Sequence, residues 1–165
     1  ERILDAAVSF IPVLMPGYHP DAADINEAID HGVASCAARS YAAALFLRHA
    51  LPNEDLYRID FGFSPEHGED YQGENGTYIK MGHAVARLWV PEQTPVIVET
   101  FDDASIELIH PMDTHDSFIW DSATAGYKDY LERADLETVV EPSEILRTMF
   151  RQLKLRSQAT LARIS

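Results

Sequence analysis

Cys36, the single cysteine of the chain, opens an alanine-rich segment over residues 34–50 that is expected to be a helix. The first turn of a helix presents unpaired N–H groups and the positive end of the helix dipole. Both stabilise a thiolate, and the N–H groups can also hydrogen-bond to an oxyanion. Cys36 is therefore a candidate nucleophile, although a lone cysteine is also commonly a small buried hydrophobic residue.

His83 is the candidate base for this nucleophile. It lies in an expected strand over residues 78–90, broken or turned near Gly82, in which side chains alternate between the two faces and His83 shares its face with Val85. The small side chains of Ala84 and Ala86 leave room for a helix to approach the strand closely. The alternative interpretation is a core histidine whose nitrogens are satisfied by hydrogen bonds.

Glu99 is the candidate acid that would orient the histidine. It interrupts an apolar strand over residues 96–101, where a carboxylate needs a partner because an unpaired buried charge is expensive. Antiparallel pairing with the His83 strand would bring Glu99 beside the imidazole, whereas an outward-facing Glu99 is the alternative. Asp102 and Asp103 are more typical of a solvated turn, but Asp102 remains a second candidate for the acid.

The elements that must position these residues follow the order helices, strands, helices. Helices are expected over residues 1–11, 25–30, 34–50, 127–133 and 143–161, and strands over residues 57–63, 78–90, 96–101 and 106–109. Residues 64–77 are expected to be a loop, with a turn at Asn75-Gly76. This order favours an α+β fold over alternating βαβ units.

Composition and charge limit the classes of partner. The chain has 165 residues, of which 46% are hydrophobic, as expected for a single globular domain over residues 1–165. Its formal net charge of −14 repels phosphate backbones and disfavours nucleic-acid binding. No stretch approaches the ~20 apolar residues of a membrane span, and no basic-then-apolar leader begins the chain. We therefore expect a cytoplasmic protein without membrane contact, trimmed from a longer chain with possible additional domains.

The same residues resemble the core of the transglutaminase-like family. The matching segments are Cys36 with its helix, Leu47-Arg48, Ala50-Leu51-Pro52, Tyr57-Arg58-Ile59, Gly62, Gly82-His83-Ala84-Val85, Leu88-Trp89-Val90-Pro91 and Glu99. The resemblance covers roughly residues 25–102, and a helical extension over residues 127–161 follows it. It implies a papain-like core, in which N-terminal helices place the nucleophile helix on an antiparallel sheet and C-terminal helices complete the fold.

The resemblance also implies a chemistry, in which Cys36 attacks an amide carbonyl, His83 shuttles the proton and Glu99 orients His83. The implied activity is cysteine-dependent hydrolysis or acyl transfer on a peptide or protein substrate through a Cys36 thioester, with no cofactor and no metal. Hydrolysis and transamidation share this intermediate. A peptidase or amidase is favoured because nothing in the sequence marks a site for an acceptor amine.

Two departures from the family pattern keep a second function open. Glu99 stands where the family usually has aspartate, and Val85 stands where it usually has tryptophan. Both slightly favour a catalytically inactive binding module with the same fold. A third alternative is a papain-like enzyme of the arylamine N-acetyltransferase kind, which would use an acyl-CoA donor, but no matching sequence surrounds Cys36.

A group of histidines and aspartates between residues 110 and 116 has ligand types that suit zinc or manganese. Its members are His110, Asp113, His115 and Asp116. Pro111 interrupts the segment and the spacing is irregular, so a solvated loop or a segment at the rim of the substrate site is the favoured interpretation. For a second oxyanion donor, the sequence offers Tyr18 and His31 as weak candidates.

Overall fold

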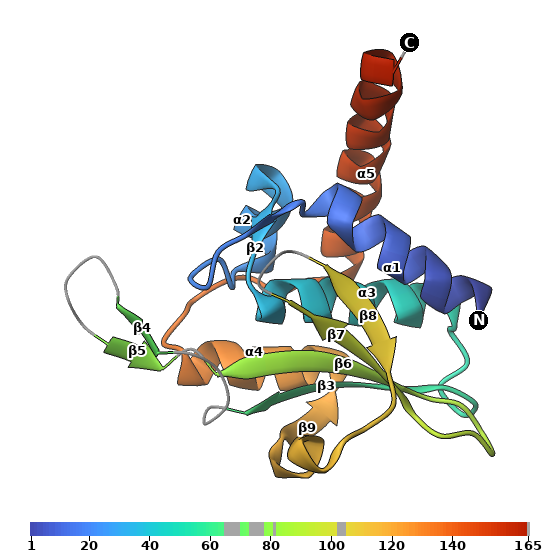
Figure 1. Ribbon diagram of the computed structural model, residues 1–165, viewed down its shortest axis with the longest axis vertical. Coiled ribbons are helices and arrows are strands. Elements are labelled where there is room, and N and C mark those ends of the chain that lie inside the picture. The colour runs from blue at the N-terminus through green and yellow to red at the C-terminus, as the bar shows by residue number, and fades with distance from the viewer. Residues whose placement is uncertain (65–69, 73–77, 81, 102–104, 165) are drawn as a thin grey trace.

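The computed structural model describes the chain except for residues 65–69, 73–77, 81, 102–104 and 165. Its architecture is α+β, as the sequence predicts (Figure 1). The described helices are α1 (Arg2–Leu14), α2 (Ile25–His31), α3 (Cys36–Ala50), α4 (Ala123–Arg133), α5 (Pro142–Ile164) and the short 3₁₀ helix η1 (Asp113–Ser117). The strands are β1 (Gly17–Tyr18), β2 (Val33–Ala34), β3 (Arg58–Ser64), β4 (Asp70–Gln72), β5 (Tyr78–Lys80), β6 (His83–Trp89), β7 (Val96–Thr100), β8 (Ile106–Ile109) and β9 (Ile119–Ser122).

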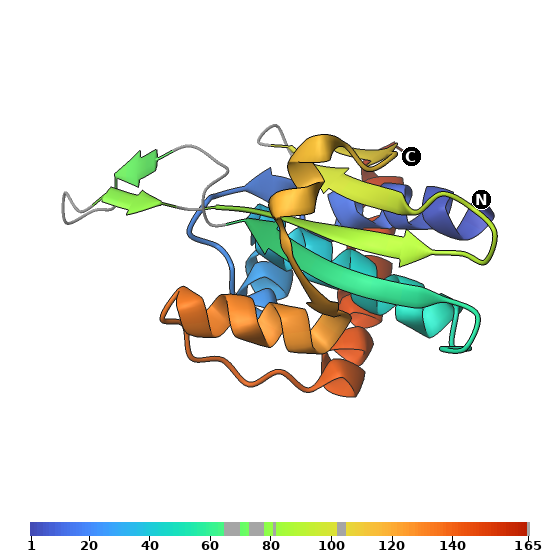
Figure 2. The ribbon, with the colours of Figure 1, turned by 90° about the horizontal axis from the view of Figure 1, so that it is seen from below.

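The main sheet has five antiparallel strands in the order β8-β7-β6-β3-β9, so β6 lies at its centre. Helix α3 lies against one face of this sheet, with α1 and α4 beside it (Figures 1 and 2). The opposite face carries a smaller apolar cluster of Val85, Ile97 and Phe118. The sheet therefore separates a large helical core from a second, thinner layer that is formed in part by the segment between β8 and β9.

Helix α3 is buried around its whole circumference from Cys36 to Leu47. Helices α1 and α4 cover the sides of α3 that do not face the sheet. The alanine side chains allow close packing against β6, and the hydroxyl of Ser40 donates to the carbonyl of Ala84 at 3.0 Å. This contact fixes the first turns of α3 against the start of β6.

Helix boundaries confirm several expectations and correct others. Asp24 caps α2 by accepting from two backbone N–H groups, and Gly32 ends the helix at a φ of 72°, which glycine adopts without strain. Helix α1 continues through Pro12 to Leu14, beyond the expected end at residue 11, because proline in the last turn removes only one hydrogen bond. Helix α4 begins at Ala123, earlier than expected.

The region around residues 64–77 was predicted to be a loop, yet it contains β4, which pairs with β5. Antiparallel pairing of Gln72 with Tyr78 agrees with a hairpin, although the proposed turn at Asn75-Gly76 lies outside the described residues. The expected break near Gly82 separates β5 from β6. The sequence analysis did not anticipate β1, β2, β9 or η1, all of which are short.

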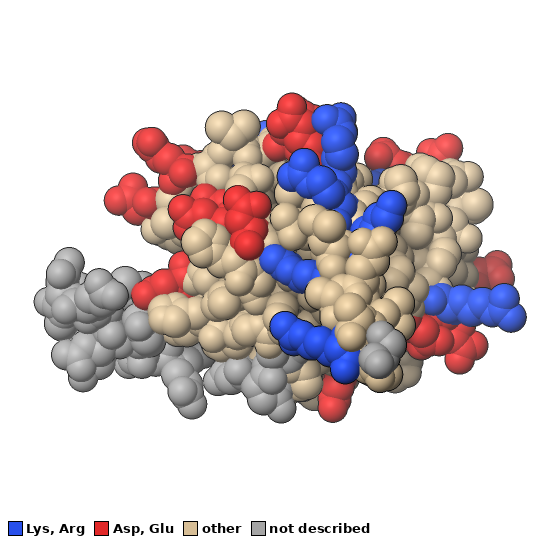
Figure 3. Space-filling model, turned by 90° about the horizontal axis from the view of Figure 1, so that it is seen from above, with Lys and Arg blue, Asp and Glu red and all other residues tan. Residues whose placement is uncertain are grey.

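Helix α5 projects from the body of the molecule (Figure 1) and differs from it in charge. It carries five of the 13 Lys and Arg residues but only one of the 27 Asp and Glu residues. Figure 3 shows basic side chains around the end from which α5 projects, with acidic side chains towards the rim. Arg156 ties α5 to the body by donating to the carbonyls of Leu14 and Ile29. In the described part of the chain, no helix combines the length and apolar character needed to cross a membrane.

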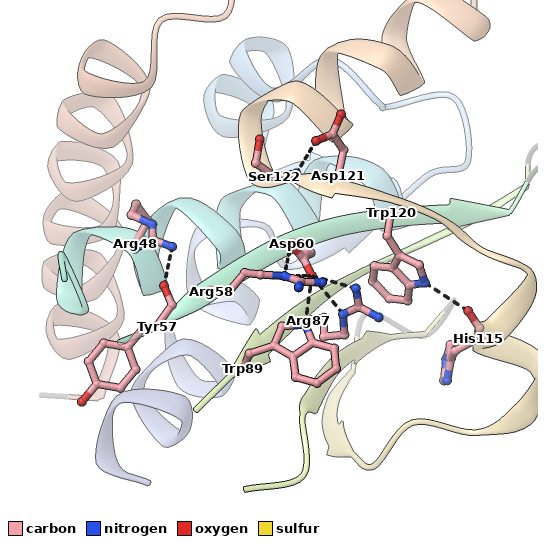
Figure 4. Close-up of polar contacts among 10 residues, drawn as sticks. All are labelled: Arg48, Tyr57, Arg58, Asp60, Arg87, Trp89, His115, Trp120, Asp121 and Ser122. Atoms are coloured by element: carbon pink, nitrogen blue, oxygen red, sulfur yellow. Dashed lines mark hydrogen bonds and ion pairs between the residues drawn. The ribbon is translucent and has the colours of Figure 1, made fainter. Parts of the chain in front are cut away.

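Asp60 organises the sheet face opposite α3 (Figure 4). This buried carboxylate accepts hydrogen bonds from Arg58, from Arg87 at 2.7 Å and from the indole N–H of Trp89 at 3.0 Å. Asp60 and Arg87 are directly opposite each other on β3 and β6. Their pairing therefore fixes the register of the strand that begins with His83.

We expect Asp60→Ala to lower the free energy of unfolding by about 3–5 kcal/mol, because Arg87 would keep a largely buried charge without its partner. The matched control is Arg58→Ala, which removes a donor whose side chain is 62% exposed and should cost less than about 1 kcal/mol. Urea unfolding followed by circular dichroism measures both. Equal losses in the two variants would contradict a structural role for the Asp60–Arg87 pair.

Candidate functional site: a cysteine, a histidine and a buried glutamate

Cys36 is the first residue of α3, as the sequence analysis expected, and its side chain is 7% exposed. Ser35 caps the helix, and its own backbone N–H donates to the carbonyl of Ala22 at 2.8 Å. One turn further on, the fully buried Arg39 donates to the carbonyl of Gly17 at 2.8 Å. The helix start that carries the thiol is thus held in place by the two segments that precede it.

His83 is the first residue of β6, paired with Ser64 at the end of β3. Its Nε2 contacts Oε1 of Glu99, and Cys36 lies near enough to the ring to raise the pKa of His83. Since Nε2 faces the glutamate, Nδ1 is the nitrogen left for the thiol. The side chain keeps 27% of its surface exposed, so the imidazole lies between the buried acid and solvent.

Glu99 lies on β7 and is 7% exposed, which rules out the alternative of an outward-facing side chain. Strand alternation places it on the face of Ile97, the same sheet face as His83 and opposite α3. The expected antiparallel pairing of the two strands is confirmed. The competing candidates Asp102 and Asp103 lie outside the described residues.

The environment of His83 determines its protonation. Burial alone would lower the pKa of His83, but the hydrogen bonds and charges of Cys36 and Glu99 outweigh it and raise this pKa from 6.5 to about 10. His83 therefore holds its proton at neutral pH while its two partners favour the charged ring. An imidazolium between a thiol and a carboxylate is the arrangement that supports a thiolate nucleophile.

His115 lies near this group, and its burial was not predicted. Its segment was expected to be a solvated loop or to lie at the rim of the substrate site, but His115 lies in η1, is 5% exposed, and its Nε2 is 3.7 Å from Oε2 of Glu99. The nearby His110 and Asp116 are exposed, as a loop would predict. No group of three potential metal ligands occurs among the described residues. Nothing in the sequence indicated that His115 is buried while His110 and Asp116 are exposed, because η1 has no regular hydrophobic period.

Tyr130 is a second neighbour of the thiol that the sequence did not indicate. It lies on α4, packs against Phe63 with ring centroids 5.6 Å apart, and is largely buried. Burial raises the pKa of Tyr130, and the charges of Cys36 and Asp21 raise it further. The weak oxyanion candidates are placed differently: Tyr18 lies in β1 with its ring facing Arg39, and His31 is exposed at the end of α2.

A large open groove of about 920 Å³ lies elsewhere, between α2, α4 and the segment that follows α4. Asn26, Lys128 and Glu132 are among its lining residues, whereas Cys36, His83 and Glu99 do not line it. It holds no cysteine and no histidine, so its size does not make it the centre of the chemistry. We therefore place the candidate site at Cys36, His83 and Glu99 and not at this groove.

Comparison of the chain with models of known protein families, with curated proteins and with solved structures found no match. The geometry of Cys36, His83 and Glu99 is therefore the basis for inferring the function.

We expect the imidazole of His83 to titrate with a pKa near 10 when followed by NMR across the alkaline range. Cys36→Ser and Glu99→Gln should each lower this value, because both partners raise it through hydrogen bonds and charge. The exposed His110 serves as an internal reference in the same spectra. A midpoint for His83 near 6.5 that neither substitution moves would show that the three side chains are not coupled.

Proposed function

We propose that this protein is a cysteine-dependent amide-bond hydrolase or acyltransferase that acts on peptide or protein substrates through a Cys36 thioester. The observation that carries this proposal is the position of His83, whose ring contacts the buried Glu99 and lies next to Cys36. A nucleophile, a base and a group that orients the base are the three parts that such chemistry requires. We also propose that residues 25–102 form a transglutaminase-like core, as their sequence resemblance implies.

The proposed reaction uses the sulfur of Cys36 and the imidazole proton of His83. The Cys36 thiolate attacks the carbonyl carbon of the amide, and the resulting oxyanion is stabilised by N–H groups at the start of α3. The C–N bond then breaks, and His83 gives its proton to the departing amine. Water or a second amine next attacks the thioester, His83 accepts the proton of this second nucleophile, and Cys36 leaves as a thiolate.

Glu99 contributes through His83 rather than through the substrate. Its contact with Nε2 fixes the ring so that Nδ1 faces the thiol, and its negative charge favours the protonated ring. The replacement of the family's usual aspartate by glutamate is therefore compatible with the orienting role. The longer side chain still reaches the imidazole from the neighbouring strand.

The peptide or protein character of the substrate is supported by the resemblance to transglutaminase-like enzymes, and nucleic acid is disfavoured by the charge of −14. The alternative function, an inactive binding module, is slightly favoured by Glu99 in place of the usual aspartate and by Val85 in place of the usual tryptophan. Val85 is fully buried with Ile97 and Phe118, so it serves the packing of the second layer. The two functions differ in whether Cys36 is reactive, which a labelling experiment can measure.

We expect iodoacetamide to label Cys36 rapidly at and below neutral pH, where an ordinary thiol is mostly protonated. In His83→Ala the labelling rate at neutral pH should fall by about ten-fold or more, because the base that shares the proton is gone. Intact-mass spectrometry gives the rate without ambiguity, since the chain has a single cysteine.

His110→Ala is the matched control, because it removes an exposed histidine that should leave labelling unchanged. A second measurement then tests turnover: a glutamine-containing peptide mixture with a fluorescent primary amine distinguishes transamidation from hydrolysis, with Cys36→Ser as the blank. Slow labelling that is identical in the wild-type protein and His83→Ala would overturn the proposal and favour the inactive binding module.

A further inference from the structure

The geometry points to His115 as a positioning residue that holds the carboxylate of Glu99 in the orientation His83 needs. This inference rests on the proposed function and deepens it, because it adds a fourth side chain to the Cys36–His83–Glu99 connection. His115 does not approach the thiol. It acts on the second oxygen of the carboxylate, with its Nε2 3.7 Å from Oε2, while Oε1 contacts His83.

The backbone fixes which nitrogen of His115 carries the proton. The N–H of Met112 donates to Nδ1 of His115 at 3.0 Å, so Nδ1 must present its lone pair. The neutral ring therefore carries its proton on Nε2, the nitrogen that faces Glu99. This arrangement directs an N–H donor towards the free oxygen of the carboxylate.

One backbone contact and one ring contact hold His115 in place. The indole N–H of Trp120 donates to the backbone carbonyl of His115 at 3.1 Å (Figure 4). The imidazole of His115 packs edge-on against Phe118, with ring centroids 5.2 Å apart. Trp120 is itself covered by the guanidinium of Arg87, 3.7 Å from the ring centroid. His115 is thus tied to the same layer that Asp60 organises through Arg87.

Glu99 has particular need of a donor on this side. Glu99 is 7% exposed and lies directly opposite Glu107 on β8, a pairing of like charges that destabilises a sheet. Glu107 is exposed and can turn towards solvent, but Glu99 cannot. Two imidazoles, one on each oxygen, offset the desolvation of Glu99 and restrict rotation of its carboxylate.

The test compares three variants by the pH dependence of Cys36 labelling and by thermal unfolding. His115→Phe keeps an aromatic ring against Phe118 but removes the donor, and labelling at neutral pH should slow by roughly three- to ten-fold. His115→Gln restores an N–H donor near the Nε2 position, and its rate should lie within about two-fold of wild type. His110→Phe, the matched control on an exposed residue, should leave the rate unchanged.

A combined variant separates positioning from a general loss of structure. If His115 acts through Glu99 and His83, His83→Ala with His115→Phe should label at the same rate as His83→Ala alone. A labelling profile in His115→Phe identical to that of wild type, while His83→Ala is slowed, would overturn the role of His115 and leave the proposed function standing. If His83→Ala labels like wild type, both proposals fail.

Should His115→Phe not fold, the wild-type protein still decides the question. Nitrogen-15 NMR of the imidazoles identifies the protonated nitrogen, and we expect the proton of His115 on Nε2. A proton on Nδ1 would mean that no donor faces Glu99, and would overturn the inference.

Discussion

The burial of Glu99 is the constraint on which the site depends. A carboxylate in the middle of an apolar strand is costly unless charged or hydrogen-bonding groups surround it. His83 contacts Oε1 of Glu99, and His115 lies near Oε2. Because Cys36 and Glu99 together raise the pKa of His83 to about 10, the contact that stabilises the acid also helps to keep the imidazole protonated next to Cys36. The stability of the buried acid and the proposed reactivity of Cys36 thus depend on the same contact.

The two faces of the sheet contribute different parts of this site. Helix α3 packs on one face and brings Cys36 to its end, whereas His83 and Glu99 project from the other face. The residues meet because His83 is the first residue of its strand and so lies at the end of the sheet near the start of α3. Ala84 and Ala86 allow the helix to approach, and the Asp60–Arg87 pair fixes the register that sets where β6 begins.

Much of this arrangement could be predicted from local sequence. The alanine run and its serine cap place Cys36 in the first turn of α3, and the charge inside residues 96–101 identifies Glu99 as a buried group in need of a partner. His115 could not be found in this way, because its burial depends on η1 folding back over the sheet against Phe118 and Trp120. Such contacts join segments whose sequences have no helical or strand periodicity, so they cannot be predicted from local sequence. The same reason explains why the two-residue strands β1 and β2 were missed.

The most direct test of the account is the ultraviolet absorbance of the Cys36 thiolate as a function of pH, measured against Cys36→Ser. A protonated His83 beside the sulfur should stabilise the thiolate, so we expect its absorbance at neutral pH in the wild-type protein and its loss at that pH in His83→Ala. An absorbance that appears only in the alkaline range of a free thiol, and equally in both proteins, would show that Cys36 and His83 are not a coupled pair and would contradict the account.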